Sequence, residues 1–169
     1  MALKKQSITP RFSLILHNIR STQNVGAIFR TGDGAGVDMV FLSGYTPTPL
    51  DKFNRSNTKI AKTALGAEKS VSWEHHKSPT TLIRKLKKEG VRIIGVEQSA
   101  RSVSYTAWKP HAPIAVIFGN EVLGVSKQLL ALCDEVVEIP MHGGKESLNV
   151  SVAAGIILFK AAETLTPSE

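Results

Sequence analysis

The chain has 169 residues, a length that suits one folded domain with a sizeable core. Hydrophobic residues make up 42% of it, which is ordinary for a globular protein and too high for a disordered one. No apolar stretch approaches the roughly 20 residues of a membrane span, and the first residues lack the apolar run of a signal peptide. A single cysteine, Cys133, excludes an intramolecular disulfide framework, so a reducing cytoplasm is the expected compartment.

Charge is distributed unevenly along the chain. The formal net charge is +7, which favours a polyanionic partner. Residues 1–109 carry 18 Lys and Arg against seven Asp and Glu, whereas residues 110–169 carry three against seven. Phosphate contacts are therefore expected on the N-terminal two-thirds. A solvated basic surface without a partner is the alternative that charge alone leaves open.

Apolar runs and amphipathic stretches alternate along the first half of the chain. Strands are expected at residues 12–16, 38–42 and 68–73, and helices at 24–35, 59–65 and 80–89. The first of these helices places its apolar residues on one face at helical spacing: Val25, Ile28, Phe29 and Gly32.

The second half repeats this rhythm. Strands are expected at residues 91–96, 114–118 and 135–139, and helices at 126–132 and 147–162. Ser126 is the expected N-cap of the shorter helix, and the longer one is expected to bury a stripe of Leu148, Val152, Ile156 and Phe159. Alternating strands and helices with continuous apolar strands predict a single α/β domain, with a parallel sheet covered on both faces.

In open α/β sheets, ligands bind beyond the carboxyl ends of the strands. Three loops leave such ends here, at residues 17–30 (HNIRSTQNVGAIFR), 118–126 (FGNEVLGVS) and 139–151 (IPMHGGKESLNVS). Gly119, Gly143 and Gly144 allow a backbone to approach a ligand closely. The loops hold Gly, Asn, Ser, Glu and Arg without an obvious nucleophile, a set that suits positioning chemistry on a bound cosubstrate.

Several familiar sites are excluded by spacing. The GDGAG run at 32–36 closes a helix instead of opening one, so it is not a dinucleotide-binding fingerprint, and GGKES at 143–147 lacks the pattern of a P-loop. The five histidines and Cys133 show no metal-ligand spacing, so no metal is expected. Cys133 precedes two acidic residues, which would raise its thiol pKa, and it is expected to be buried and inert.

Each polar residue of these loops also has a purely structural interpretation. Asn24 fits an N-cap, Arg30 falls off the apolar stripe of its helix, and Glu121 fits a turn cap. Ser147 and Asn149 fit an ordinary helix start, with Ser147 as the N-cap. Taken singly, none of them establishes a catalytic site.

Taken together, three strings in this order are specific: NVGAIFRTGDGAGV, FGNEVLGVS and IPMHGGKESLNVSVAAGI. They closely resemble the signature motifs of the SpoU/TrmH family, the 2′-O-ribose methyltransferases of the SPOUT superfamily, over residues 12–162. The resemblance implies S-adenosylmethionine as the cosubstrate and transfer of its methyl group to a ribose 2′-hydroxyl in tRNA or rRNA. It also implies a C-terminal trefoil knot and a homodimer with a composite active site across the interface.

The resemblance also implies roles for individual residues. The catalytic residues fall on Asn24, Arg30, Glu121, Ser147 and Asn149, and the cosubstrate-binding backbone falls near Val96, Gly119, Ile139, Ser147 and Leu148. The family's usual assignment makes Arg30 the general base. Since a guanidinium keeps its proton in proteins, the alternative is that Arg30 grips an RNA phosphate and stabilises the developing alkoxide.

The basic excess supplies the expected RNA contacts, namely Arg11, Arg20, Arg30, Lys52, Arg55, Lys59 and Lys62. A single methyltransferase domain over 1–169, without a separate RNA-binding domain, is the expected organisation. Two rival interpretations remain open. One is a catalytically silent RNA-binding or ribosome-assembly factor on the same fold, and the other is an oxidoreductase of flavodoxin or Rossmann type.

Overall fold

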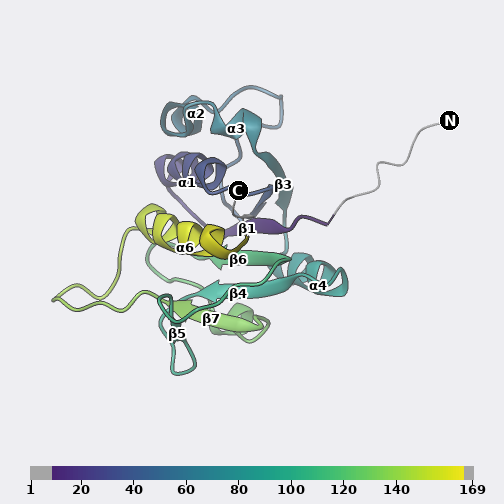
Figure 1. The fold of residues 1–169 in the computed structure, drawn as a ribbon. Coiled ribbons are helices and arrows are strands. Elements are labelled where there is room, and N and C mark those ends of the chain that lie inside the picture. The colour runs from purple at the N-terminus through teal and green to yellow at the C-terminus, as the bar shows by residue number, and fades with distance from the viewer. Residues whose placement is uncertain (1–8, 166–169) are drawn as a thin grey trace.

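A parallel seven-stranded sheet forms the middle of the computed structural model, which describes residues 9–165 (Figure 1). The strands run in the order β3-β2-β1-β6-β4-β7-β5, and each pairing is parallel. The strands are β1 (Phe12–His17), β2 (Met39–Ser43), β3 (Ser72–His76), β4 (Arg92–Val96), β5 (Val103–Ser104), β6 (Ile114–Phe118) and β7 (Glu135–Glu138). The helices are α1 (Thr22–Gly34), α2 (Thr58–Ala64), α3 (Ala67–Ser70), α4 (Pro79–Lys88), α5 (Lys127–Leu130) and α6 (Val150–Leu165).

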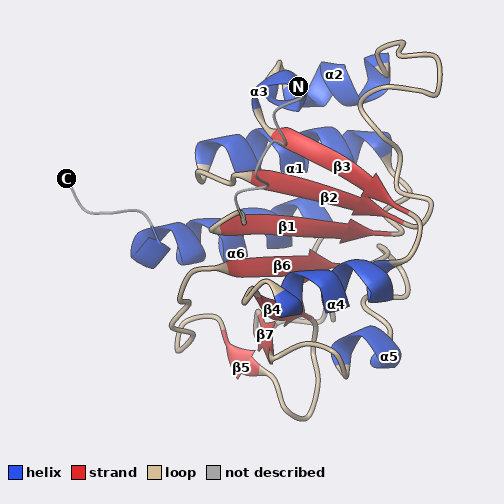
Figure 2. Ribbon diagram, turned by 90° about the vertical axis from the view of Figure 1, so that its right-hand side faces the viewer, coloured by secondary structure: helices blue, strands red, loops and turns tan. Residues whose placement is uncertain are grey.

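Helices cover both faces of this sheet. Figure 2 shows α4 and α5 on the face toward the viewer, with α1 and α6 behind the sheet. Successive residues of a strand point to opposite faces, so Leu14 of β1 packs in the cluster with α1 and α6, whereas Ile15 packs in the cluster with α4 and α5. The α/β architecture expected from the sequence, with continuous apolar strands buried on both sides, is therefore confirmed.

The sheet has a switch in strand order beside β1. From β1 the chain proceeds outward to β2 and β3, and then returns to the other side, where β6 pairs with β1. The chain consequently leads from β1 to α1 and from β6 to α5 on opposite faces of the sheet, and parallel sheets of this kind bind ligands at the carboxyl ends of such strands.

Two short elements of the structure differ from the sequence analysis. Residues 68–73 do not form a strand, because α3 occupies 67–70 and the edge strand β3 follows at 72–76. Gly66 starts α3 in a left-handed conformation (φ 98°), and the Glu68 carboxylate accepts a hydrogen bond from its N–H. The second is the strand β5, which has only two residues and was not expected at all. Both edge strands, β3 and β5, lack the continuous apolar run that identifies the inner strands in the sequence.

The expected start and buried face of the last helix are also wrong. Helix α6 begins at Val150, and the Oδ1 of Asn149, not a hydroxyl of Ser147, accepts the N–H of Ser151 at 2.8 Å. The helix buries Ala154, Ile157, Leu158 and Ala161 instead of the expected stripe, whose members Leu148, Val152 and Phe159 are exposed. The reason is that α6 is apolar on almost every face, so periodicity alone could not select the face that meets the sheet.

The expectation for the first helix is confirmed, since Val25, Ile28, Phe29 and Gly32 are all buried. Among residues 9–165, no helix is long and apolar enough to cross a membrane.

Candidate active site

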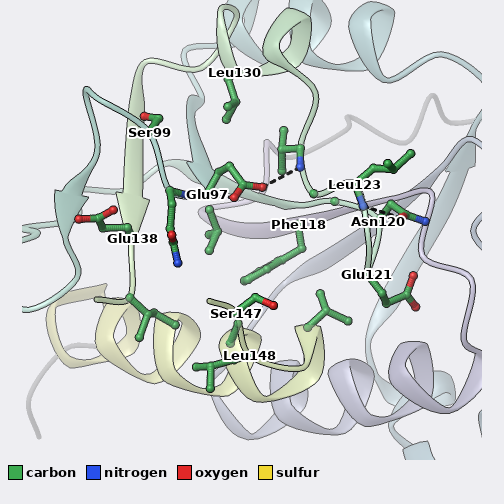
Figure 3. Close-up of a pocket in the computed structure, with 18 of the residues that line it drawn as sticks. Glu97, Ser99, Phe118, Asn120, Glu121, Leu123, Leu130, Glu138, Ser147 and Leu148 are labelled. Atoms are coloured by element: carbon green, nitrogen blue, oxygen red, sulfur yellow. Dashed lines mark hydrogen bonds between the residues drawn. The ribbon is translucent and has the colours of Figure 1, made fainter. Parts of the chain in front are cut away.

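A cavity of about 710 Å³ opens among the loops that follow β4, β6 and β7 (Figure 3). Its lining includes all five residues expected at the cosubstrate site, which are Val96, Gly119, Ile139, Ser147 and Leu148. These residues come from three separate stretches of the chain, and only the fold brings them together. Figure 3 shows Ser147 and Leu148 on the side of the cavity that faces α6, opposite Leu130.

The cavity combines carboxylates with apolar walls. Glu97, Glu121 and Glu138 line it, together with Phe118 and the largely exposed Leu123. The Glu97 carboxylate is held in place, since its oxygens accept the N–H of Val125 at 3.0 Å and of Gln98 at 2.9 Å. A cavity with negative charge and apolar surface suits a ligand that is cationic at one point and apolar elsewhere.

Glycines allow the loop after β6 to fold back over this cavity. A Cβ on Gly119 would collide with the backbone of Gly124, and a Cβ on Gly124 would collide with the Glu97 carboxylate. Gly124 also has a φ of +64°, which favours glycine. The turn is closed by Asn120, whose Oδ1 accepts the N–H groups of Val122 and Leu123 at 2.9 Å each.

Glu121 binds this loop to the start of α1. Its carboxylate accepts the backbone N–H of Arg20 at 3.0 and 3.1 Å and that of Ser21 at 3.0 Å. It also accepts the side-chain amide of Asn24 at 3.3 Å. Glu121 therefore does more than cap its own turn, because it joins two motifs about a hundred residues apart in the sequence.

The third motif joins the same chain of hydrogen bonds. The Nδ2 of Asn149 donates to the Oδ1 of Asn24 at 3.2 Å. Asn24 is free for this contact because it is not the N-cap of α1, a position taken by Ser21, whose hydroxyl accepts the N–H of Asn24 at 3.2 Å. Glu121, Asn24 and Asn149 thus form one polar cluster, hereafter the Glu-Asn-Asn cluster.

The hydrogen bonds also keep Glu121 ionised. Partial burial opposes ionisation of the carboxyl, but the bonds from Arg20, Ser21 and Asn24 outweigh it and lower the pKa of Glu121 below its ordinary value. At neutral pH the cluster therefore contains a carboxylate, which can only accept hydrogen bonds.

Arg30 lies away from this cluster. It is six residues after Asn24 on α1, which places it roughly 9 Å further along the helix axis and on another face. Within residues 9–165 its guanidinium has no hydrogen bond or ion pair, and it lines a second, shallower cavity of about 580 Å³ with Lys62 and Phe159. A single chain therefore does not bring the expected catalytic arginine to the other expected catalytic residues.

All seven basic residues expected to contact RNA are exposed, but they do not share one surface. Arg11 precedes β1 and so lies at the amino edge of the sheet, opposite the site loops. Arg20 lies at the carboxyl edge, and the loop that carries Lys52 and Arg55 leaves that edge after β2. Lys59 and Lys62 belong to α2. Arg11 is therefore poorly placed for the expected contact with RNA.

Sequence reasoning missed Glu97, Asn120 and Tyr45. Asn120 donates its amide to the Tyr45 hydroxyl at 2.9 Å and to the carbonyl of Asn18 at 3.1 Å, which joins the loops after β1, β2 and β6. A signal was available for the first two residues, since Glu97 is polar and directly follows β4, and Asn120 is polar and lies two residues after the end of β6. Tyr45 gave no such signal.

Cys133 is buried, as expected. Burial, more than the neighbouring Asp134, raises the pKa of its thiol to about 11, and its Sγ donates to the carbonyl of Leu129 at 3.3 Å. Among residues 9–165, no group of three or more His, Cys, Asp or Glu side chains is arranged to hold a metal ion. The expectation that no metal is needed stays a prediction.

These observations define a class of protein: a parallel α/β domain with a cavity among its carboxyl-end loops and a polar cluster beside that cavity. Residues 11–159 match the SpoU rRNA Methylase family, and the chain belongs to that family. The resemblance seen in the sequence is thereby confirmed.

Individual relatives agree with this assignment. The chain is 36% identical over 152 residues to the 23S rRNA (guanosine-2′-O-)-methyltransferase RlmB of Ralstonia nicotianae, with 90% of the chain and 58% of that relative covered. The chain thus spans less than two-thirds of that relative.

Solved structures share the fold. An AdoMet-bound rRNA methyltransferase from Sinorhizobium meliloti superposes with a TM-score of 0.81 at 25% identity, covering 93% of this chain and 57% of that one. A structure concerned with 2-OH methylation of C/U34 on tRNA superposes with a TM-score of 0.76 at 26% identity, covering 94% of this chain and 99% of that one.

Proposed function

We propose that this protein transfers the methyl group of S-adenosylmethionine to a ribose 2′-hydroxyl of an RNA. The observation that carries the proposal is the Glu-Asn-Asn cluster, which joins all three family motifs by hydrogen bonds at the rim of the cavity. Family membership and the methyltransferase relatives support the reaction type. The cytoplasmic location remains a prediction of the sequence.

The cavity fits S-adenosylmethionine. Its volume of about 710 Å³ suits a ligand of this size. Three carboxylates in the lining provide negative charge for a sulfonium and for hydroxyl or amino donors, while Phe118, Ile139 and Leu148 provide apolar surface. When bound, S-adenosylmethionine supplies a methyl group that is already strongly electrophilic, so the protein needs chiefly to orient the acceptor and help it lose a proton.

Different residues of the chain are assigned to orienting the acceptor and to stabilising charge. We assign Asn24 and Asn149 to orienting the ribose, since Asn149 lies between two cavity-lining residues and Asn24 is bonded to it and to the cavity-lining Glu121. We assign Glu121 to holding Asn24 and the start of α1 in place. Ser147 lines the cavity and is exposed, so its hydroxyl is available to the ribose or to the cosubstrate. We assign Arg30 to an RNA phosphate and to the developing alkoxide, because a fixed positive charge there lowers the barrier.

The distance of Arg30 from the cluster supports a homodimer with a composite site. Val152 and Phe159 on α6 are 51% and 53% exposed, and the loop at 141–149 extends from the body of the protein (Figure 1). A second copy would cover this apolar face and supply its own Arg30 to the cluster of the first. Phe159→Asp should yield a monomer in analytical ultracentrifugation, and a variant that stays dimeric would contradict this interface.

A trefoil knot at the C-terminus is a further part of the proposal. It is supported by β7, which returns to pair with β4, and by the segment after β7, where the carbonyl of Glu146 accepts the Gln98 amide at 2.7 Å. Stretching the unfolded chain from its two ends should then give a contour shorter than its residue number predicts. A full contour length would exclude the knot.

The direct test is methyl transfer from labelled S-adenosylmethionine to purified tRNA and rRNA fragments. We expect label in a nucleotide that resists alkaline cleavage, as a 2′-O-methyl ribose does, and none when that nucleotide carries 2′-deoxyribose. Cosubstrate binding without transfer to any RNA would instead support the silent RNA-binding factor. Absence of cosubstrate binding would overturn the proposal altogether.

A further inference from the structure

The loop between β2 and α2 carries two exposed aromatic side chains. Phe53 is 65% exposed and Tyr45 is 58% exposed. Isolated exposed apolar residues are common on protein surfaces, so exposure alone assigns no role. The surroundings of Phe53 are what distinguish it.

The tip of this loop, residues 50–56, holds Phe53 at a fixed position. The Oδ1 of Asp51 accepts the N–H of Phe53 at 2.8 Å and that of Arg55 at 2.9 Å, and the N–H of Asp51 donates to the carbonyl of Arg55 at 2.9 Å. An isolated antiparallel bridge between Leu50 and Ser56 closes the tip. The backbone is therefore ordered although the Phe53 ring lies largely in solvent.

Two cations lie over the Phe53 ring. The Nζ of Lys52 lies 5.0 Å from its centroid and the Cζ of Arg55 lies 5.1 Å from it. Arg55 is held there by its Nε, which donates to the Asp51 carboxylate at 2.7 Å. Lys52 has no ion pair within residues 9–165, so it is able to move aside. When the Lys52 side chain moves off the ring, the exposed aromatic ring offers a stacking surface, and the two cations that now lie over it offer phosphate contacts.

The start of the same loop is bonded to the active-site loop. The Tyr45 hydroxyl accepts the amide of Asn120, the residue before Glu121, and the Tyr45 N–H donates to the Oδ1 of Asn18 at 3.1 Å. The loop that carries Phe53 is thus anchored beside the Glu-Asn-Asn cluster, at the edge where the ribose would react.

We propose that Phe53 is a stacking platform for an unpaired base of the RNA substrate, with Lys52 and Arg55 contacting adjacent phosphates. The inference rests on the proposed methyl transfer to RNA. It specifies the class of substrate, because a base inside a duplex is already stacked on both sides, whereas a base in a loop or single strand has a free face. The site should therefore favour unpaired RNA.

The test compares Phe53→Ala, Phe53→Leu and Phe53→Trp. Leu retains apolar surface without an aromatic face, and Trp enlarges that face, so the two variants separate stacking from general hydrophobic contact. The probes are a short oligoribonucleotide without self-complementarity and the duplex that it forms with its complement. Because Phe53 is exposed, the melting temperature should stay close to that of the unmodified protein in all three variants.

We expect Phe53→Ala and Phe53→Leu to weaken binding of the single strand by about five- to 150-fold, the range measured for loss of one stacked base. Duplex binding should change much less. Phe53→Trp should retain affinity, and its indole fluorescence should be quenched by the single strand.

Equal affinities for the single strand in all four proteins would overturn the inference, as would equal losses for single strand and duplex. A change in dimerisation with RNA affinity unchanged would also overturn it and would make Phe53 a protein contact. Methyl transfer by the unmodified protein distinguishes these failures from failure of the proposed function.

Discussion

The start and the later part of helix α1 differ in how many hydrogen bonds their polar side chains make within the chain. At its start, Asn24 donates to Glu121 and accepts from Asn149, so residues from three motifs hold one another in place within a single chain. Six residues later, the Arg30 side chain lies in solvent beside the exposed Phe159, and its guanidinium has no hydrogen bond or ion pair to any residue between 9 and 165. The side chains at the start of the helix are already held in a geometry that can orient a ligand. The Arg30 guanidinium, in contrast, is bound to no anionic group among the described residues.

This difference indicates that the two parts of α1 have different roles in the proposed reaction. The part that needs accurate geometry is organised by hydrogen bonds within the chain, which cost nothing further when a ligand binds. Arg30, which supplies charge, reaches its site of action only when partners bind. In our proposal these partners are the RNA and a second copy of the protein. Variants in the two parts should therefore fail in different ways.

The largest effect is expected at Arg30. Arg30→Ala should lower methyl transfer by about 10²–10³-fold, the usual result of removing a charge contact to the transition state. The melting temperature and cosubstrate affinity should be nearly unchanged, because the side chain is exposed and lies outside the main cavity. Arg30→Lys should not restore activity, since lysine lacks the planar pair of donors. Turnover above about a tenth of the original would contradict this role.

Removing the charge of Glu121 should lower turnover by roughly 10²-fold, because misplacement of positioning groups by about 1 Å has effects of that size. Glu121→Gln is the suitable variant, since its shape is similar but only one oxygen remains to accept the bonds. Unlike Arg30→Ala, it should also lower the melting temperature. If activity fell while thermal stability were unaffected, Glu121 would act on the substrate instead of on the cluster.

The same variant gives a pH test. Since the pKa of Glu121 is lowered in the folded protein, its contribution to stability is complete above the ordinary carboxyl value of 4.5 and is lost as the pH falls below it. The difference in melting temperature between the original protein and Glu121→Gln should therefore shrink on acidification. A constant difference would show that the carboxylate charge is not what matters.

The smallest effect concerns RNA affinity. Replacing Arg55 and Lys59 together by Ala should flatten the slope of log affinity against log salt by roughly 0.7–0.9 per lost contact, with cosubstrate affinity unchanged. Arg11→Ala is the matched control, because Arg11 lies at the opposite edge of the sheet. An equal change per removed charge in the control would mean that the basic residues act only through net charge.

The sequence predicts the inner part of this fold well, for a physical reason. The inner strands are buried on both faces and form continuous apolar runs in the sequence, so the predicted bounds of β1 and β6 lie within a residue of the observed ones. The edge strands β3 and β5 have little apolar pattern, because one side of each faces solvent. Their placement depends on neighbours that only the folded sheet provides.

The site shows a similar limit. The motifs identified Asn24, Glu121 and Asn149, but sequence alone treated Asn24 as a possible N-cap and Glu121 as a possible turn cap. Their hydrogen bonds with each other depend on the pairing of β1 with β6 and the packing of α6 beside α1. The sequence predicts the wrong buried face for α6 because nearly all of its faces are apolar. That excess of apolar surface is itself the feature that supports a dimer.

The composite site is tested most directly by mixing two inactive variants. Arg30→Ala and Asn149→Ala are co-refolded in equal amounts, which should give heterodimers in which one site combines an intact Arg30 with an intact Asn149. Random pairing predicts recovery of about a quarter of the original activity. If heterodimers form, as shown by capture through a tag on one variant, and activity stays at the level of either variant alone, the two residues act within one chain and the account is contradicted.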